Sequence, residues 1–172
     1  MNFSGIKEIT IPEGKVKSIT SGGLLLWKGG YTNLVDTATT EPGGTEIYGG
    51  VGYKNGYRWS SSTNAENSAY AYARLTGWMP YVQNGLLRIK NFGLDRNETG
   101  YGGYVTGYYL VMRTTDGGYQ VEAGKWYTED YCEINLTYSG ITHFRISGYC
   151  THNYQGTPLI DPPIVTINEE IT

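Results

Sequence analysis

The chain has 172 residues, of which 39% are hydrophobic and only 17% charged, and it contains 25 Gly and 17 Tyr. The hydrophobic share is too high for a disordered polyelectrolyte, and the abundance of Gly and Tyr favours strands joined by tight turns over helices. The net charge of −3 provides no basic field for nucleic acid or an anionic membrane, and no run approaches the roughly 20 apolar residues that span a bilayer.

The first thirty residues alternate short β-type segments with turn residues. Segments Ile6–Ile11, Val16–Thr20 and Leu24–Lys28 are separated by Pro and Gly positions, which predicts a three-stranded β-meander over residues 1–30. A unit of this size does not bury a core of its own. We therefore expect it to serve attachment or oligomerisation, through the apolar side chains Leu24, Leu25, Leu26 and Trp27.

From Tyr31 onward, short β segments are separated by clusters of Gly, Asn, Asp and Ser. This spacing predicts an all-β fold, an antiparallel β-sandwich of jelly-roll type over residues 31–172, similar in kind to a carbohydrate-binding module. The predicted strands are Thr45–Tyr48, Tyr57–Ser60, Tyr70–Leu75, Leu86–Phe92, Tyr104–Thr114, Tyr119–Glu122, Tyr131–Tyr138, Thr142–Tyr149 and Ile164–Asn168.

Two turns are predicted to close β-hairpins. Asp116-Gly117 lies between two β runs, and Asp-Gly readily adopts the positive φ angles of a primed turn. Ser139-Gly140 is a second, weaker hairpin signal. Cys132 and Cys150 lie on either side of it, so they could be cross-strand neighbours, either as a disulfide or as two reduced thiols.

The alternation of strand direction predicts that three long loops meet at one end of the sandwich. These loops are Gly93–Gly103, Gly124–Asp130 and Cys150–Pro163, and they combine aromatic rings with carboxylates and amides. Aromatic faces accept the C–H side of a sugar while polar groups bind its hydroxyls, although Tyr-rich loops also simply cap cores. The predicted ligand-binding residues are Tyr101, Trp126, Tyr127, Asp130, His152 and Tyr154.

Residues for catalysis are sparse. The chain has two histidines, His143 and His152, and it lacks a nucleophile elbow, a phosphate-binding Gly-rich loop and a zinc-protease helix. Glu129 and Asp130 are a carboxylate pair, but adjacent strand residues point to opposite faces, which disfavours a glycosidase. We therefore predict a protein that is not an enzyme, and a glycan-cleaving enzyme is a distant alternative.

One predicted loop carries oxygen ligands. Asp95, Asn97 and Glu98 have side chains that suit Ca²⁺, but their spacing is not that of an EF-hand loop. A solvated acidic loop is the favoured interpretation, so neither a metal nor another cofactor is predicted.

Several short segments together resemble a known class of proteins. They are Ile11-Pro12-Glu13-Gly14, Val16-Lys17-Ser18-Ile19, Gly22-Gly23, Leu26-Trp27-Lys28, Tyr31-Thr32-Asn33-Leu34-Val35, Gly52-Tyr53-Lys54-Asn55-Gly56-Tyr57-Arg58, Ser60-Ser61-Ser62, Thr76-Gly77-Trp78-Met79-Pro80, Arg145-Ile146-Ser147 and Ile164-Val165-Thr166-Ile167-Asn168-Glu169-Glu170-Ile171. With these the chain resembles virion-associated β-sandwich proteins encoded by phages and prophages of Gram-positive gut bacteria, such as tail, baseplate, head-fibre and decoration proteins.

The resemblance implies a place in the virion, after synthesis in the cytoplasm of the bacterial host. Its implied partners are other virion proteins and further copies of the same chain, with a trimer as one option, and a host-surface glycan. It implies neither nucleic-acid binding nor membrane insertion, and it carries over no catalytic residue. The alternative is a purely structural capsid or tail decoration protein without a ligand.

Overall fold

The computed structural model describes residues 18–21, 24–28, 31–68, 73–92, 106–126, 131–150 and 161–171, which form two compact units divided between Tyr31 and Thr32. In the first unit, β1 (Ser18–Ser21) pairs antiparallel with β2 (Leu24–Lys28), and a β-bulge separates Ile19 from Thr20. β2 has the predicted bounds. The predicted strand Ile6–Ile11 lies outside the described residues, and the assembly role of Leu24–Trp27 remains a prediction.

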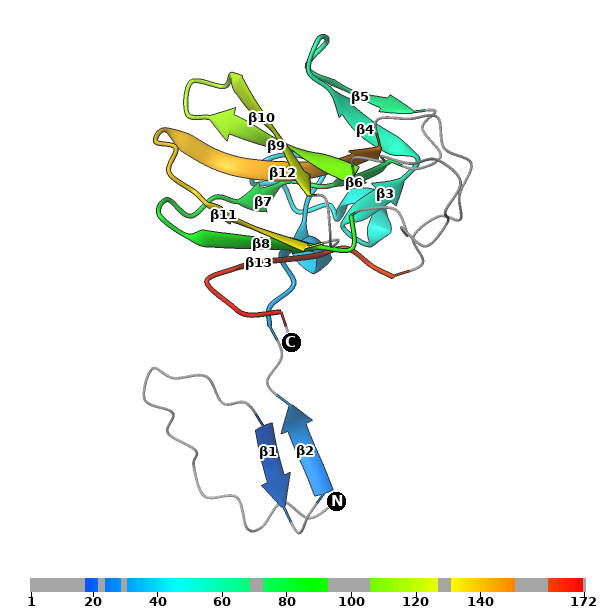
Figure 1. Ribbon diagram of the computed structural model, residues 1–172, viewed down its shortest axis with the longest axis vertical. Helices are drawn as coiled ribbons and strands as arrows, with labels where there is room; N and C mark the ends of the chain where they lie inside the picture. Colours follow the sequence, from blue (N-terminus) through cyan, green and yellow to red (C-terminus); the bar gives the residue numbers. More distant parts are fainter. Residues whose placement is uncertain are drawn as a thin grey trace. The chain divides into compact units, whose positions relative to one another are not determined.

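The second unit contains a large antiparallel sheet. Its strands lie side by side in the order β10-β9-β12-β6-β3, and β7 pairs with β12 next to β6 (Figure 1). The strands are β3 (Tyr53–Asn55), β6 (Arg74–Thr76), β7 (Met79–Pro80), β9 (Thr106–Thr114), β10 (Tyr119–Trp126) and β12 (Ile141–Cys150).

A smaller antiparallel sheet packs against the large one. It has the order β11-β8-β13, formed by β11 (Tyr131–Asn135), β8 (Leu86–Lys90) and β13 (Ile164–Ile167). A separate hairpin pairs β4 (Tyr57–Ser60) with β5 (Ala65–Ser68). The helices of the described residues are two short 3-10 turns, η1 (Leu34–Thr37) and η2 (Tyr48–Gly50), so the predicted all-β sandwich is confirmed.

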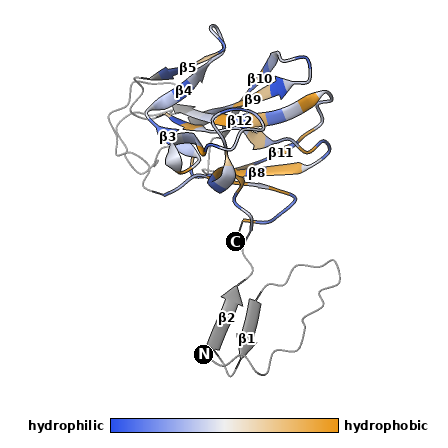
Figure 2. Cartoon of the chain, turned by 180° about the vertical axis from the view of Figure 1, so that it is seen from behind, coloured by the Kyte–Doolittle hydropathy of each residue, from blue (hydrophilic) through white to orange (hydrophobic). Residues whose placement is uncertain are grey.

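The main core lies between the two sheets. Residues that alternate along each strand turn to this interior, because successive strand side chains point to opposite faces. Hydrophobic stretches along β8 and β12 are visible in Figure 2. The interior residues Leu87, Ile89, Leu110, Met112, Phe144, Ile146 and Val165 are all at most 1% exposed.

Some predicted strands have different bounds. Thr45–Tyr48 is not a strand, because Ile47 forms only an isolated bridge with Thr39 and the chain then enters η2 at Tyr48, where Gly49 and Gly50 follow. The predicted strand Tyr131–Tyr138 ends at Asn135. The predicted strand Tyr119–Glu122 continues to Trp126, so Trp126 ends a strand and does not belong to a loop.

The two predicted hairpins differ in outcome. The hairpin at Asp116-Gly117 is confirmed, although its turn is not a primed one: Gly117 N donates to Thr114 O at 3.0 Å, and Gly117 adopts a φ of 89° that favours glycine. Ser139-Gly140 does not form a hairpin, because it links β11 of the small sheet to β12 of the large one. Cys132 and Cys150 are therefore not cross-strand neighbours.

Candidate functional site

The two sheets have matching strand ends at one end of the sandwich. In the large sheet, Thr106 at the start of β9 lies opposite Trp126 at the end of β10 and opposite Cys150 at the end of β12. In the small sheet, Lys90 at the end of β8 lies opposite both Tyr131 and Ile164. We call these two rows of strand ends the loop end.

Three connections leave from this loop end. The segments 91–105, 127–130 and 151–163 join β8 to β9, β10 to β11 and β12 to β13, and each runs from one sheet to the other. The connections 81–85, 115–118 and 136–140 belong to the opposite end, and only 91–105 and 151–163 are longer than these. Strand alternation explains this division, since every strand of an antiparallel sheet starts at the end where its neighbours finish.

All but one of the sequence-predicted ligand residues belong to these connections, and Trp126 directly precedes one of them. Tyr101, Tyr127, Asp130, His152 and Tyr154 lie outside the described residues, and Trp126 is placed by its backbone as the last residue of β10. The strand register places the strand ends next to these connections, at Thr106, Trp126 and Cys150, in one row. Convergence of the side chains themselves stays a prediction.

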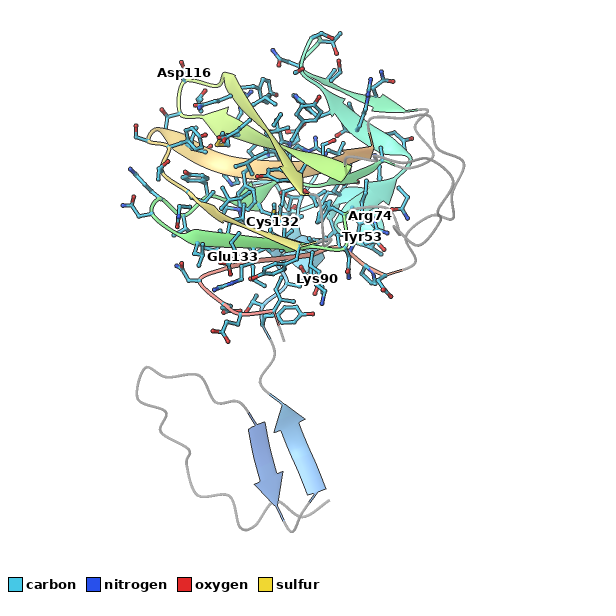
Figure 3. The ribbon with its side chains drawn as sticks, viewed as in Figure 1. Tyr53, Arg74, Lys90, Asp116, Cys132 and Glu133 are labelled. Atoms are coloured by element: carbon cyan, nitrogen blue, oxygen red, sulfur yellow. The ribbon has the colours of Figure 1, made fainter. Side chains whose placement is uncertain are left out.

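A buried arginine, Arg74, holds two of the three connections at their bases. Its guanidinium donates from Nη1 to the carbonyls of Asn91 and Asp161, the latter at 2.6 Å, and from Nε to Asn55 Oδ1 at 2.9 Å. Arg74 is 3% exposed, and its guanidinium lies over the ring of Tyr53 at 5.3 Å; both residues are labelled in Figure 3. Arg74 therefore links the start of segment 91–105 to the end of segment 151–163.

Further contacts support the same base. Asn91 Nδ2 donates to Pro162 O at 2.9 Å, which joins these two segments directly. The lack of a side chain at Gly148 lets the backbone at Phe92 lie close to β12, because a Cβ at this position would be 2.7 Å from Phe92 O. The loop end thus has a rigid, hydrogen-bonded base, which is what a binding site on loops needs.

A second buried arginine, Arg145, lies on the opposite face of the large sheet. Its Nε and Nη2 donate to Thr76 O at 2.9 and 2.7 Å, and Nη1 donates to Glu66 Oε1 at 2.8 Å. The rings of Tyr48, Trp59 and Trp78 surround it at 4.9, 5.6 and 5.1 Å. We call Tyr48, Trp59, Glu66, Trp78 and Arg145 the outer-face cluster.

The outer-face cluster fixes the β4–β5 hairpin on the sheet. Trp59 of β4 donates its backbone N–H to Ser147 Oγ at 2.9 Å, and Tyr48 Oη donates to Glu66 Oε2 at 2.7 Å. Trp59 and Trp78 are 4% and 5% exposed, so their faces are not open to a ligand. We therefore interpret this cluster as a structural contact.

Burial and charge set the pKa values of the outer-face cluster. Burial alone would raise the pKa of Glu66, but the charge of Arg145 and the hydrogen bonds from Tyr48 and Arg145 outweigh it and hold that pKa below its ordinary value. Burial, together with the bond to Glu66, raises the pKa of the Tyr48 hydroxyl well above its ordinary value. Glu66 is thus ionised and Tyr48 neutral at pH 7.

Sequence reasoning missed both arginines. Arg145 sits between Phe144 and Ile146 in an alternating strand, a pattern that equally describes a solvated outer face. The sequence shows only a single charge between apolar neighbours, which does not reveal that the distant strand with Trp59 covers it. Arg74 had no comparable signal, because its partners are mainly backbone carbonyls.

The sequence also singled out an acidic loop, two histidines and the lack of a membrane-spanning segment. Asp95, Asn97, Glu98 and His152 lie outside the described residues, among which no group of three or more His, Cys, Asp or Glu is placed to hold a metal ion. His143 is half-buried on β12, where burial lowers its pKa. In the described part of the chain, no helix is long and apolar enough to cross a membrane.

No family model, no curated protein and no solved structure matches this chain.

Proposed function

We propose that this chain is a component of a phage particle whose β-sandwich binds a host-surface glycan at the loop end, without catalysis. The observation that supports this proposal most is the common row of strand ends at Thr106, Trp126 and Cys150. The predicted ligand residues lie either in the connections that adjoin this row or, for Trp126, in the row itself. The resemblance to virion-associated β-sandwich proteins supports the location in a particle.

The chemistry of the loop end favours a glycan. Its connections carry aromatic rings beside carboxylate, amide and imidazole groups, a combination that stacks on a sugar ring and hydrogen-bonds its hydroxyls. The Arg74 base would hold two of the connections in place, which lowers the entropy cost of binding. A shallow site of this kind binds weakly, and a particle with many copies would supply avidity.

Two aromatic residues of the same strand offer a matched test. Trp126 ends β10 at the loop end, whereas Tyr119 begins β10 at the opposite end and is 40% exposed. Trp126→Ala should weaken glycan or host-cell binding at least about fivefold, which corresponds to the loss of ~1 kcal/mol from one stacking aromatic. Tyr119→Ala should bind like the unchanged chain.

The measurement is binding of the purified chain and both variants to a glycan array and to host cells, after circular dichroism shows that each is folded. Tyr48 would be a poor control, because it is 2% exposed and bonded to Glu66, so truncation would test stability. Equal losses from both variants, or none from Trp126→Ala, would reject the loop end as the site. Absence of glycan binding by the unchanged chain would favour the purely structural decoration protein.

A further inference from the structure

Strand β10 is a long free edge of the large sheet. It spans Tyr119–Trp126, pairs with β9 on one side, and keeps an unbroken register without a β-bulge or Pro. Among the described residues no strand pairs with its other side. Soluble proteins usually protect such an edge by shortness, bulges, Pro or charges, and β10 has only the last, at Glu122 and Lys125.

The other edge strands of the two sheets, β3, β11 and β13, are shorter than β10. β3, at the far edge of the large sheet, has only three residues. β11, at one edge of the small sheet, carries Glu133, which accepts from Arg88 Nε and from Tyr131 Oη, both at 2.7 Å. β10 is therefore the edge most suited to pairing with another strand.

The hairpin geometry shows which groups β10 directs outward. Thr114 N donates to Gly118 O at 3.1 Å, so this pair is hydrogen-bonded across the hairpin. Hydrogen-bonded pairs alternate along an antiparallel ladder, so the even-numbered residues of β10 bond to β9. The N–H and C=O groups of Tyr119, Val121, Ala123 and Lys125 consequently point to the free edge.

We propose that β10 pairs antiparallel with β10 of a second copy of this chain, about a two-fold axis at Ala123. A two-fold axis normal to a sheet brings residues of the same parity opposite each other, because both copies keep the same faces up. With the axis at Ala123, Val121 lies opposite Lys125 and Gln120 opposite Trp126. Seven residues, Gln120–Trp126, then pair in one continuous sheet.

Charge and size select this register. An axis at Glu122 or Lys125 would set like charges directly opposite each other, which destabilises a ladder. An axis at Val121 is free of that conflict but pairs only Tyr119–Ala123 of β10. With the axis at Ala123, Glu122 of one copy lies opposite Gly124 of the other. The side chains at the axis are then the two Ala123 methyl groups, one from each copy.

This inference goes beyond the proposed function, because it concerns assembly and holds whether or not a glycan binds. The two β10 strands run in opposite directions in this pair. Their loop ends therefore face away from each other, and the pair itself does not add avidity for one surface. Its consequence is a fixed two-fold unit for building a larger assembly.

The test uses the full chain and Ala123→Lys, which places two lysines at the axis and leaves the hydrogen bonds to β9 intact. Light scattering should give this variant half the mass of the unchanged chain at equal concentration, whatever other contacts contribute. The matched control is Val82→Lys, which changes a 45% exposed residue off β10 and should keep the full mass. An unchanged mass in Ala123→Lys, or a monomeric unchanged chain, would overturn the proposal.

A cross-link tests the axis itself without relying on destabilisation. Opposite residues of a hydrogen-bonded pair have Cα atoms about 5.5 Å apart, within the reach of a disulfide. Under mild oxidation Ala123→Cys should therefore form a covalent dimer that non-reducing electrophoresis detects. Val82→Cys, in the same background of Cys132 and Cys150, should remain a single chain. No covalent dimer from Ala123→Cys would overturn the register.

Discussion

The two buried arginines hold different parts of the sandwich in different ways. Arg74, at the loop end, binds the backbone carbonyls of Asn91 and Asp161, whereas Arg145, in the outer-face cluster, binds one carbonyl and the carboxylate of Glu66. The first arginine joins two chain segments at the loop end. The second ties the stability of the β4–β5 hairpin to a titrating group, so the two regions should respond differently to mutation and to pH.

The largest expected effect comes from Arg145→Met. Removing one partner of a buried pair is strongly destabilising, and here three aromatic rings also lose their central cation. We expect a loss of about 3 kcal/mol in the free energy of unfolding, because the remaining Glu66 carboxylate is 31% exposed and regains some water. Urea unfolding at pH 7 measures it. A loss smaller than that of Arg74→Met would show that Arg145 contributes less to the stability of the fold than Arg74 does.

Arg74→Met should cost less and act locally. The part-buried carbonyls of Asn91 and Asp161 lose their donor, and each should cost toward the low end of the about 1–3 kcal/mol of a fully buried acceptor. Amide hydrogen exchange should accelerate at residues 91–92 and at Asp161, while residues 57–60 remain as protected as in the unchanged chain. Equal acceleration in the β4–β5 hairpin would show that the two regions are not separate.

A pH titration separates the two regions by mechanism. Because the folded-state pKa of Glu66 is lowered, its contribution to stability is fully present above its ordinary value of 4.5 and is lost as pH falls through the lowered value. The stability difference between the unchanged chain and Glu66→Gln should therefore shrink as pH drops below 4.5. Thermal unfolding from pH 7 to pH 3 tests this. A difference that is independent of pH would contradict the coupling to Arg145.

Tyr48→Phe should give the smallest effect. It removes the hydroxyl that donates to Glu66 Oε2 at 2.7 Å and keeps the ring that packs on Arg145. A hydrogen bond to a charged group contributes about 1.5–3 kcal/mol, and the low end of this range applies because the carboxylate retains Arg145. Urea unfolding should therefore place this variant closest to the unchanged chain, and a loss as large as that of Arg145→Met would mean that Tyr48 carries the cluster.

The strands could be predicted from the sequence because period-two alternation and turn residues are local signals. β2 and β4 have the predicted bounds, and Asp116-Gly117 does close a hairpin. The hairpin predicted at Ser139-Gly140 was wrong, because a short turn can join two strands of one sheet or two strands of different sheets. Sheet membership depends on which strands meet in space.

The buried arginines could not be predicted for a related reason. An Arg in an alternating strand is solvated unless another element covers it, and the cover over Arg145 is the β4–β5 hairpin, distant in the sequence. Likewise, the partners of Arg74 come from Asn55, Asn91 and Asp161, and backbone carbonyls leave no trace in residue type. Loop grouping, by contrast, needs only the direction of each strand.

The central claim, glycan binding at the loop end, is tested most directly by hydrogen exchange with and without a host cell-wall glycan that the chain binds. A glycan bound at the loop end should slow exchange in segments 91–105, 127–130 and 151–163 and leave β4–β5 and the 115–118 turn unchanged. Slower exchange in β4–β5 or the 115–118 turn, with no change in those three connections, would contradict it.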